Sequence, residues 1–294
     1  MSDSKHKSPL SDVAFNSLGL EPAIMEGIEA AGFTHCTPIQ ALTLPPALDG
    51  KDVAGQAQTG TGKTAAFLLV IFQRLLQDDR RDQRGNNPAA IVIAPTRELA
   101  LQIHKDAVTL GQGTGLTLGL AYGGIDYDKQ RKELQNGVDV LIGTPGRMID
   151  YYKQRVFNLN HVQVAVLDEA DRMFDLGFIK DIRYLFRGMP PVDQRQTLMF
   201  SATLSHRVME LAYVHMNEPE TLKVETEQVT ADNVEQSVYY PANKEKLPML
   251  VQLLGDVGDG RVIVFTNTRE GADRIGRTLN ANGLELSLIH ISEP

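Results

Sequence analysis

Four residues that follow an apolar run carry the clearest chemical signal in this sequence of 294 residues. The run Val162–Leu167 predicts a buried strand, and Asp168, Glu169, Ala170 and Asp171 come directly after it. An acidic cluster at such a strand end is typical of a site that holds Mg²⁺ and aims water at a phosphate. We therefore expect Asp168 to hold the metal ion through its water shell and Glu169 to orient or deprotonate the water. Alone, the cluster would also suit an acidic helix N-terminus.

A glycine-rich segment earlier in the chain predicts the phosphate-binding partner of this cluster. Gly60 and Gly62 let backbone N–H groups turn inward around phosphate oxygens. Lys63 supplies a cation for the β- and γ-phosphates of ATP, and the Thr64 hydroxyl is a second ligand for Mg²⁺. The strict pattern begins with glycine where this chain has Ala57, but a predicted strand before and a helix after restore the match. The expected nucleotide-binding residues here are Gln58, Thr59, Gly60, Thr61, Gly62, Lys63 and Thr64.

Short apolar runs alternate with longer amphipathic stretches, which predicts the elements that position these residues. The predicted strands are Asp52–Gly55, Ala89–Ala94, Leu116–Tyr122, Val138–Ile142, Val162–Leu167, Gln196–Phe200 and Leu222–Val224. The predicted helices include Lys63–Gln77, Arg97–Gly111, Tyr127–Asn136 and Ser205–Met216. Repeated strand–helix–strand order indicates an α/β fold, in which helices cover both faces of a parallel sheet.

Every polar signature of the first part of the chain follows the carboxyl end of a predicted strand. Ligands bind at this edge of an open α/β sheet. The pattern therefore favours a single functional edge over the alternative that each signature is an ordinary turn. The signatures are Ala57–Thr64, Pro95–Glu98, Gly123–Gly124, Thr144–Arg147, Asp168–Asp171 and Ser201–Thr203.

Composition limits the class of protein further. The net charge of −8 is unsuited to a protein that merely coats nucleic acid, because phosphate neutralisation drives such binding. Cys36 is the single cysteine, which excludes an intramolecular disulfide and favours a reducing, cytoplasmic location. The longest strongly apolar run, Ala65–Phe72, is far shorter than the roughly 20 residues needed to span a bilayer, so we expect no membrane association.

The chain is expected to contain two domains. Residues 1–10 are predicted to be a disordered tail, 11–224 the first domain, 225–233 a linker and 234–294 part of a second domain. In that second part we expect strands Gln236–Tyr240, Arg261–Phe265 and Leu284–Ile289 with helices Lys244–Gly255 and Arg269–Asn282. The charged stretch Asp78–Pro88 is interpreted as a solvated surface insertion.

Together the motifs resemble the DEAD-box RNA helicases, which are built from two RecA-like domains of the P-loop NTPase class. The segment Gly32–Gln40 is similar to the Q motif of that family. The resemblance implies that Gln40 reads the adenine edge of ATP and that Phe15 stacks near the base. An amide offers a donor and an acceptor together, which suits adenine and disfavours guanine.

The resemblance also implies RNA contacts and a coupling element. Small hydroxyls, helix N-termini and two arginines suit binding to the sugar-phosphate chain without reading bases. The implied RNA-binding residues are Pro95, Thr96, Arg97, Gly123, Gly124, Thr144, Pro145, Gly146 and Arg147. Ser201 and Thr203 are implied to couple hydrolysis to strand separation by bonding Asp171 or Glu169, although a simple helix cap is equally compatible. Surface salt bridges are the alternative for the two arginines.

A narrower resemblance points to a bacterial branch of the family that works in the RNA degradosome. It rests on Ala121–Gly124, Tyr127–Gln130 and Asp171–Pro191, and implies mRNA turnover with an endoribonuclease partner. After Glu285 the resemblance ends, which favours an artefactual end. The second-domain arginines of the family, which contribute about 10³ to 10⁵ in rate, are not found. This chain is therefore expected to be an inactive fragment of a helicase that unwinds short RNA duplexes.

Two other functions stay open on the sequence. One is a non-catalytic fragment that binds RNA or a protein partner, and the other is a P-loop ATPase that acts on a substrate other than RNA. Gln40 and the Pro95–Ala100 and Thr144–Arg147 segments argue against the latter.

Overall fold

The computed structural model describes residues 10–78, 84–224, 235, 237–257 and 260–288. The chain divides into two compact units, Met1–Glu225 and Thr226–Pro294. The predicted tail, apart from residue 10, and the predicted linker lie outside the described residues.

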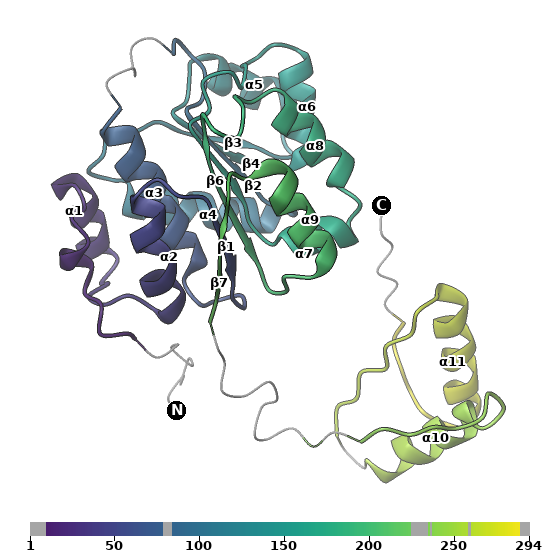
Figure 1. The fold of residues 1–294 in the computed structure, drawn as a ribbon. Coiled ribbons are helices and arrows are strands. Elements are labelled where there is room, and N and C mark those ends of the chain that lie inside the picture. The colour runs from purple at the N-terminus through teal and green to yellow at the C-terminus, as the bar shows by residue number, and fades with distance from the viewer. Residues whose placement is uncertain (1–9, 79–83, 225–234, 236, 258–259, 289–294) are drawn as a thin grey trace. The chain divides into compact units, whose positions relative to one another are not determined.

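The first unit is built on one parallel sheet of seven strands in the order β3-β4-β2-β5-β6-β1-β7 (Figure 1). All seven strands predicted for this part of the chain are present, which confirms the α/β fold class. The strands are β1 Val53–Gln56, β2 Ala90–Ile93, β3 Leu118–Ala121, β4 Val140–Gly143, β5 Val164–Leu167, β6 Gln196–Ser201 and β7 Glu220–Lys223.

Helices cover both faces of this sheet and enclose two hydrophobic cores. On one face lie α1 Pro22–Ala30, α2 Pro38–Leu48, α3 Lys63–Leu76 and α4 Arg97–Leu110, preceded by a short 3₁₀ helix, Phe15–Ser17. On the other lie α5 Tyr127–Gln135, α6 Pro145–Lys153, α7 Ala170–Asp175, α8 Ile179–Arg187 and α9 His206–His215. The central strands are apolar throughout because both of their faces are buried.

Strand β5 shows how the alternation of side chains serves both cores at once. Val164 and Val166 belong to the core under α1–α4, whereas Ala165 and Leu167 belong to the core under α5–α9. All four residues are buried, so the strand is firmly placed and delivers Asp168 at a fixed point of the carboxyl edge.

The second unit contains helices α10 Lys246–Asp256 and α11 Arg269–Ala281, close to the predicted helices. The three strands expected there were wrong, because residues 237–240, 261–265 and 284–288 form no strand in the described part of the chain. The apolar side chains of these segments remain outside a core: Ile263 is 78% exposed and Phe265 86% exposed. Strands of this kind need neighbouring strands and covering helices to bury both faces.

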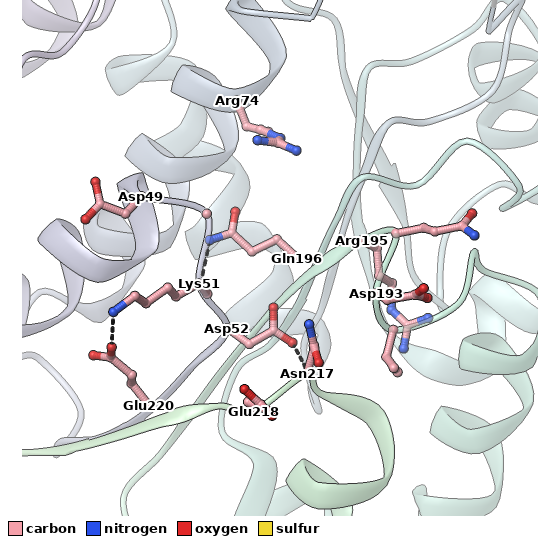
Figure 2. Close-up of a pocket in the computed structure, with 13 residues that line it drawn as sticks. Asp49, Lys51, Asp52, Arg74, Asp193, Arg195, Gln196, Asn217, Glu218 and Glu220 are labelled. Atoms are coloured by element: carbon pink, nitrogen blue, oxygen red, sulfur yellow. Dashed lines mark hydrogen bonds and ion pairs between the residues drawn. The ribbon is translucent and has the colours of Figure 1, made fainter.

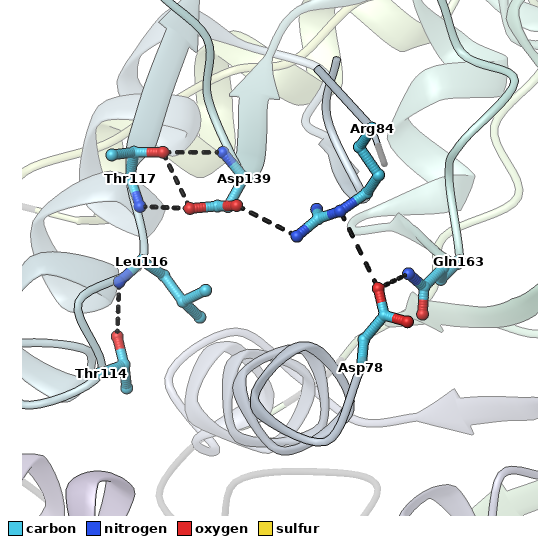
Figure 3. Close-up of polar contacts among 7 residues, drawn as sticks. All are labelled: Asp78, Arg84, Thr114, Leu116, Thr117, Asp139 and Gln163. Atoms are coloured by element: carbon cyan, nitrogen blue, oxygen red, sulfur yellow. Dashed lines mark hydrogen bonds and ion pairs between the residues drawn. The ribbon is translucent and has the colours of Figure 1, made fainter. Parts of the chain in front are cut away.

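The stretch expected to be a solvated insertion is anchored by a buried arginine (Figure 3). Arg84 is 4% exposed, and its Nη2 lies 3.3 Å from Oδ1 of Asp139 at the amino end of β4. Its Nε lies 3.8 Å from Oδ2 of Asp78, to which Gln163 also donates. The interpretation of Asp78–Pro88 as wholly solvated was therefore wrong at both described ends; residues 79–83 lie outside the described residues.

A second charged region lies where β1, β6 and β7 begin, and lines a cavity of about 480 Å³ (Figure 2). Two of its carboxylates are bound by neighbouring groups. Lys51 bonds Glu220 at 2.6 Å, and the Asp52 carboxylate accepts from the backbone N–H groups of Thr197 and Asn217 at 2.8 and 2.7 Å. This cavity lies at the amino edge of the sheet, opposite the predicted functional edge.

Candidate nucleotide and RNA site

The loop between β1 and α3 has the conformation that phosphate binding requires. Gly60 and Gly62 have φ angles of 84° and 93°, a region that glycine adopts without strain. A Cβ on Gly62 would lie 2.5 Å from Nε2 of Gln40, so this position also needs glycine for space. Thr64, in the first turn of α3, is half-buried, and the N–H groups of this helix start are available to an anion.

Lys63 and Asp168 form the electrostatic centre of the carboxyl edge. Lys63 is 5% exposed, and its Nζ donates to the Ala57 carbonyl oxygen at 2.9 Å. Asp168, 2% exposed at the end of β5, accepts a bond at Oδ1 from the N–H of Glu169 at 2.9 Å. Burial raises the pKa of Asp168 to about 6, and the positive charge of Lys63 opposes that rise. The positive charge of Lys63 therefore favours the ionised form of Asp168 at the carboxyl edge of the sheet.

Glu169 begins α7 in an uncommon backbone conformation. Its φ of 53° lies in the left-handed region, which costs energy for a residue with a side chain. The carboxylate is half-buried and lies 3.3 Å from Nη1 of Arg172.

Asp171, Ser201 and Thr203 are brought together by hydrogen bonds. Oδ2 of Asp171 accepts from the N–H and the hydroxyl of Thr203 at 3.0 and 3.1 Å. The N–H of Asp171 donates to Oγ of Ser201 at 3.1 Å. The cap of the following helix α9 is Ser205, whose side chain accepts from Val208. The acidic cluster is thus joined directly to the end of β6 and the loop beyond it.

Gln40 touches the phosphate loop. Its Oε1 accepts from the N–H of Thr37 at 2.8 Å, and its Nε2 donates to the Gly62 carbonyl oxygen at 2.9 Å. The side chain is 3% exposed, so α2 holds it firmly against the loop.

Phe15 is placed differently from what base stacking requires. Its ring is 1% exposed and belongs to the hydrophobic core. The exposed aromatic of this region is Phe33, 41% exposed, whose ring stacks on Phe15 with centroids 6.2 Å apart. The sequence pattern pointed to the region but not to the ring that solvent can reach.

The segments predicted to contact RNA lie on neighbouring strand ends. Arg97 is exposed in the first turn of α4, where the Thr96 hydroxyl accepts from the N–H of Leu99 at 3.3 Å. Gly123 and Gly124 are exposed after β3. At the start of α6, Thr144 and Arg147 are half-buried, Gly146 is exposed and Pro145 is buried, as Pro95 is before α4.

Neither predicted RNA-contacting arginine forms an ion pair with a carboxylate within the described residues. Instead, Arg97 donates to the Gly124 carbonyl oxygen and lies over the Tyr122 ring. Arg147 lies over both the Tyr127 and the Tyr151 ring. Sequence reasoning gave these tyrosines no role, although the i, i+4 spacing of Arg147 and Tyr151 on α6 is a usable signal.

A metal site made by the protein alone is absent from the part of the chain that the structure describes, where no three His, Cys, Asp or Glu side chains gather. Asp168 and Thr64 nevertheless suit Mg²⁺, because this ion keeps several waters and binds one or two protein ligands together with substrate phosphates. No helix that the structure describes is long and apolar enough to cross a membrane.

A parallel α/β sheet with a phosphate loop after β1 and an acidic cluster after β5 defines a P-loop nucleotide-binding protein. The chain belongs to the DEAD/DEAH box helicase family, whose sequence model matches residues 37–211. It is 59% identical over 283 residues to a protein of Xanthomonas axonopodis pv. citri named ATP-dependent RNA helicase RhlB. It is 55% identical over 284 residues to the RhlB of Klebsiella pneumoniae. Both alignments cover 96% of this chain.

These relatives are longer than the chain. The alignments span 50% of the Xanthomonas protein and 68% of the Klebsiella protein. Among solved structures, a DEAD box protein from the hyperthermophile Methanococcus jannaschii matches with a TM-score of 0.66 at 31% identity. That match covers 92% of this chain and 70% of the other, which confirms the RecA-like DEAD-box fold. The narrower resemblance, to one bacterial branch of the family, is also confirmed, because the relatives at 55% and 59% identity are bacterial proteins named RhlB.

Proposed function

We propose that this chain forms the ATP-binding part of an ATP-dependent RNA helicase that unwinds short RNA duplexes. One observation carries the proposal: buried Lys63, which begins α3 after β1, and buried Asp168, which follows β5, lie at the same edge of the sheet, where six sequence signatures meet. A buried lysine and a buried carboxylate with spare bonding capacity suit the combined charge of a nucleotide and its metal ion.

The nucleotide chemistry follows from the placement of these groups. Lys63 and the N–H groups of 58–64 bind the ATP phosphates, and Thr64 and Asp168 hold Mg²⁺. The metal ion neutralises charge on the phosphates as they separate. Glu169 orients or deprotonates the attacking water, since its carboxylate is less buried than that of Asp168 and stands beside it.

Recognition of adenine falls to α2 and the segment before it. The bonds of Gln40 to Thr37 and Gly62 leave one N–H and one lone pair of its amide for the base. Phe33 offers its exposed face to the base, and Phe15 supports that ring from the core. The stacking role expected of Phe15 thus becomes a supporting one.

RNA binds along Pro95–Arg97, Gly123–Gly124 and Thr144–Arg147, through backbone N–H groups, small hydroxyls and the two arginines. Such contacts hold the sugar-phosphate chain without reading sequence, and reconcile RNA binding with the net charge of −8. Asp171, Ser201 and Thr203 connect this edge to the acidic cluster and couple hydrolysis to strand separation.

The narrower resemblance in the sequence supports a proposal for the setting of this activity. We propose a cytoplasmic helicase that acts in mRNA turnover with an endoribonuclease partner. The 294 residues of this chain span about half the length of the Xanthomonas relative. We therefore propose that ATP turnover by this chain alone is negligible.

The test is ATP hydrolysis with and without single-stranded RNA, measured on this chain and on a full-length relative that carries the same residues. We expect RNA to stimulate the full-length protein, and substitutions equivalent to Lys63→Ala and Glu169→Gln to abolish that activity. The matched control is a substitution equivalent to Lys132→Ala, on an exposed lysine in the last turn of α5, which should retain most activity.

Two results would change the proposal. Hydrolysis by the full-length protein that is equal with and without RNA would favour a P-loop ATPase with another substrate. Brisk turnover by this chain with saturating RNA would contradict the proposed dependence on the second domain.

A further inference from the structure

Both arginines predicted to contact RNA are held by one segment, Tyr122–Gln130, which runs from the end of β3 into α5. Arg97 meets the first half of the segment. Its guanidinium carbon lies 5.2 Å from the centre of the Tyr122 ring, and its Nη1 donates to the Gly124 carbonyl oxygen at 3.4 Å. A Cβ on Gly124 would lie 2.9 Å from that Nη1, so the close approach depends on glycine.

Arg147 meets the second half of the same segment. Its guanidinium carbon lies 4.8 Å from the centre of the Tyr127 ring and 5.5 Å from that of Tyr151. Its Nη1 donates to Oε1 of Gln130 at 3.4 Å and to the Tyr151 hydroxyl at 3.2 Å. These distances lie within the range of attraction between a cation and an aromatic face.

The tyrosines around Arg147 are themselves fixed. Tyr151 is fully buried, and its hydroxyl donates to the Tyr127 carbonyl oxygen at 3.0 Å. The two rings lie 4.9 Å apart, and Gln154 donates to the Tyr127 hydroxyl. Helices α5 and α6 are therefore braced against each other at the place where Arg147 leaves α6.

This bracing has a consequence for binding. A free arginine side chain samples many rotamers and loses that freedom when it grips a phosphate. Arg147 has already lost much of it, yet within the described residues only its Nη1 donates hydrogen bonds, so other N–H donors remain for an oxyanion.

We propose that Tyr122–Gln130 is a positioning brace that aims Arg97 and Arg147 at one continuous stretch of RNA backbone. Tyr122 and Tyr127 are the positioning residues, acting through the two arginines. This inference rests on the proposed RNA-binding function. It also gives a reason why Gly123–Gly124 is closely followed by the start of α5 at Tyr127.

The test measures binding of this chain to a fluorescent oligouridylate, with ATP and Mg²⁺, over a range of salt concentrations. Each phosphate contact contributes about 0.7 to the slope of log affinity against log salt for a single strand. We expect Tyr127→Leu to lower that slope by about 0.7, as Arg147→Ala does, and to weaken binding about 3- to 10-fold. Tyr127→Phe keeps the ring face and should keep the slope.

Two further variants separate positioning from general damage. Tyr184→Leu removes another tyrosine that lies under a cation, Lys153 at 5.4 Å, but sits on α8, and it should leave the slope unchanged. Arg147→Lys keeps the charge but loses the planar group that stacks, and should weaken binding several-fold. It tests the brace even if Tyr127→Leu fails to fold.

The outcomes distinguish the brace from the function on which it rests. An unchanged slope in folded Tyr127→Leu, or full affinity in Arg147→Lys, would overturn the brace and leave RNA binding intact. If the losses of binding free energy from Tyr127→Leu and Arg147→Ala add up in the double variant, the two residues act independently and the brace is wrong. Absence of salt-dependent binding by the unaltered chain would overturn the proposed RNA site, and the brace with it.

Discussion

The two edges of the sheet in the first unit both bury charged side chains, but they satisfy them differently. At the amino edge, Asp52 accepts from two backbone N–H groups. Asp139 there accepts from Arg84 and from the N–H and hydroxyl of Thr117. At the carboxyl edge, Lys63 donates to one carbonyl and Asp168 accepts one N–H within the described residues.

This difference distinguishes buried charges that stabilise the fold from buried charges that have hydrogen-bonding capacity left for a ligand. A buried charge that is fully hydrogen-bonded holds the surrounding helices and strands in place. Its removal leaves its partners buried without a hydrogen-bond partner. A buried charge with bonding capacity left over is costly until a ligand completes it. Burial raises the pKa of both Asp168 and Asp52, because it disfavours the charged form; at Asp52 the backbone N–H groups of Thr197 and Asn217 oppose that rise.

The largest effect on stability is expected at the amino edge. Asp139→Ala removes the carboxylate that accepts from Nη2 of Arg84, whose side chain is 3% exposed, and leaves the buried guanidinium with only the Asp78 carboxylate at 3.8 Å. We expect a loss of about 3–5 kcal/mol in the free energy of unfolding, as is usual when one partner of a buried pair is removed. Urea denaturation measures it. The matched control, Asp150→Ala at an exposed position of α6, should change little; an equal loss in both would contradict the distinction between edges.

A gain of stability is expected at the carboxyl edge. Asp168→Asn removes a buried charge, and we expect the chain without Mg²⁺ to gain about 1–3 kcal/mol at pH 7. The folded-state pKa of about 6 exceeds the ordinary 3.8, so the stabilising contribution of the protonated acid is complete below about pH 4. It is lost as the pH rises through about 6.

The pH dependence provides the decisive comparison for this variant. Unfolding free energies of the Asn variant and the unaltered chain should converge between about pH 6 and pH 4. Glu169→Gln, at a half-buried carboxylate, should show no comparable gain. A destabilised Asp168→Asn at pH 7 would mean that the carboxylate is satisfied and that the two edges do not differ.

The smallest effect is expected at the link between the acidic cluster and the loop after β6. Thr203→Val removes the hydroxyl that donates to Asp171 but leaves the backbone N–H that also donates to it. We expect a loss of about 1 kcal/mol or less in stability and unchanged ATP affinity. Calorimetry with a non-hydrolysable ATP analogue measures the affinity. A large loss of affinity would place Thr203 in the nucleotide site instead.

Much of the first unit is predictable from local pattern. Strand runs such as Ala89–Ala94 are apolar because both faces of the sheet are covered, and the structure pairs their central part, Ala90–Ile93. The phosphate loop can be recognised in the sequence because Gly60, Gly62 and Lys63 lie within one short segment. The strands predicted for the second unit failed because an apolar run forms a strand only when neighbours bury it, as exposed Phe265 shows.

Other features depend on residues that are far apart in the sequence. The charged stretch Asp78–Pro88 gives no sign that Arg84 meets Asp139, which lies 55 positions away. The pattern selected Phe15 for base stacking, whereas packing buries that ring and leaves Phe33 at the surface. Likewise, the spacing of Arg147 and Tyr151 on α6 gives no sign that Tyr127 of α5 also lies under Arg147.

The sequence by itself determined the family, the parallel α/β fold and the chemistry of the carboxyl edge, because contiguous motifs set backbone conformation and ligand type. Tertiary structure alone decided which charges are satisfied and which remain available. It buries Lys63 and Asp168 with bonding capacity to spare, gives the carboxylates of Asp52 and Asp139 hydrogen bonds from groups far away in the sequence, and lays Arg97 and Arg147 over tyrosines. The physical reason is that solvation and hydrogen-bond satisfaction depend on every neighbour in space, whereas a motif records only neighbours in the chain.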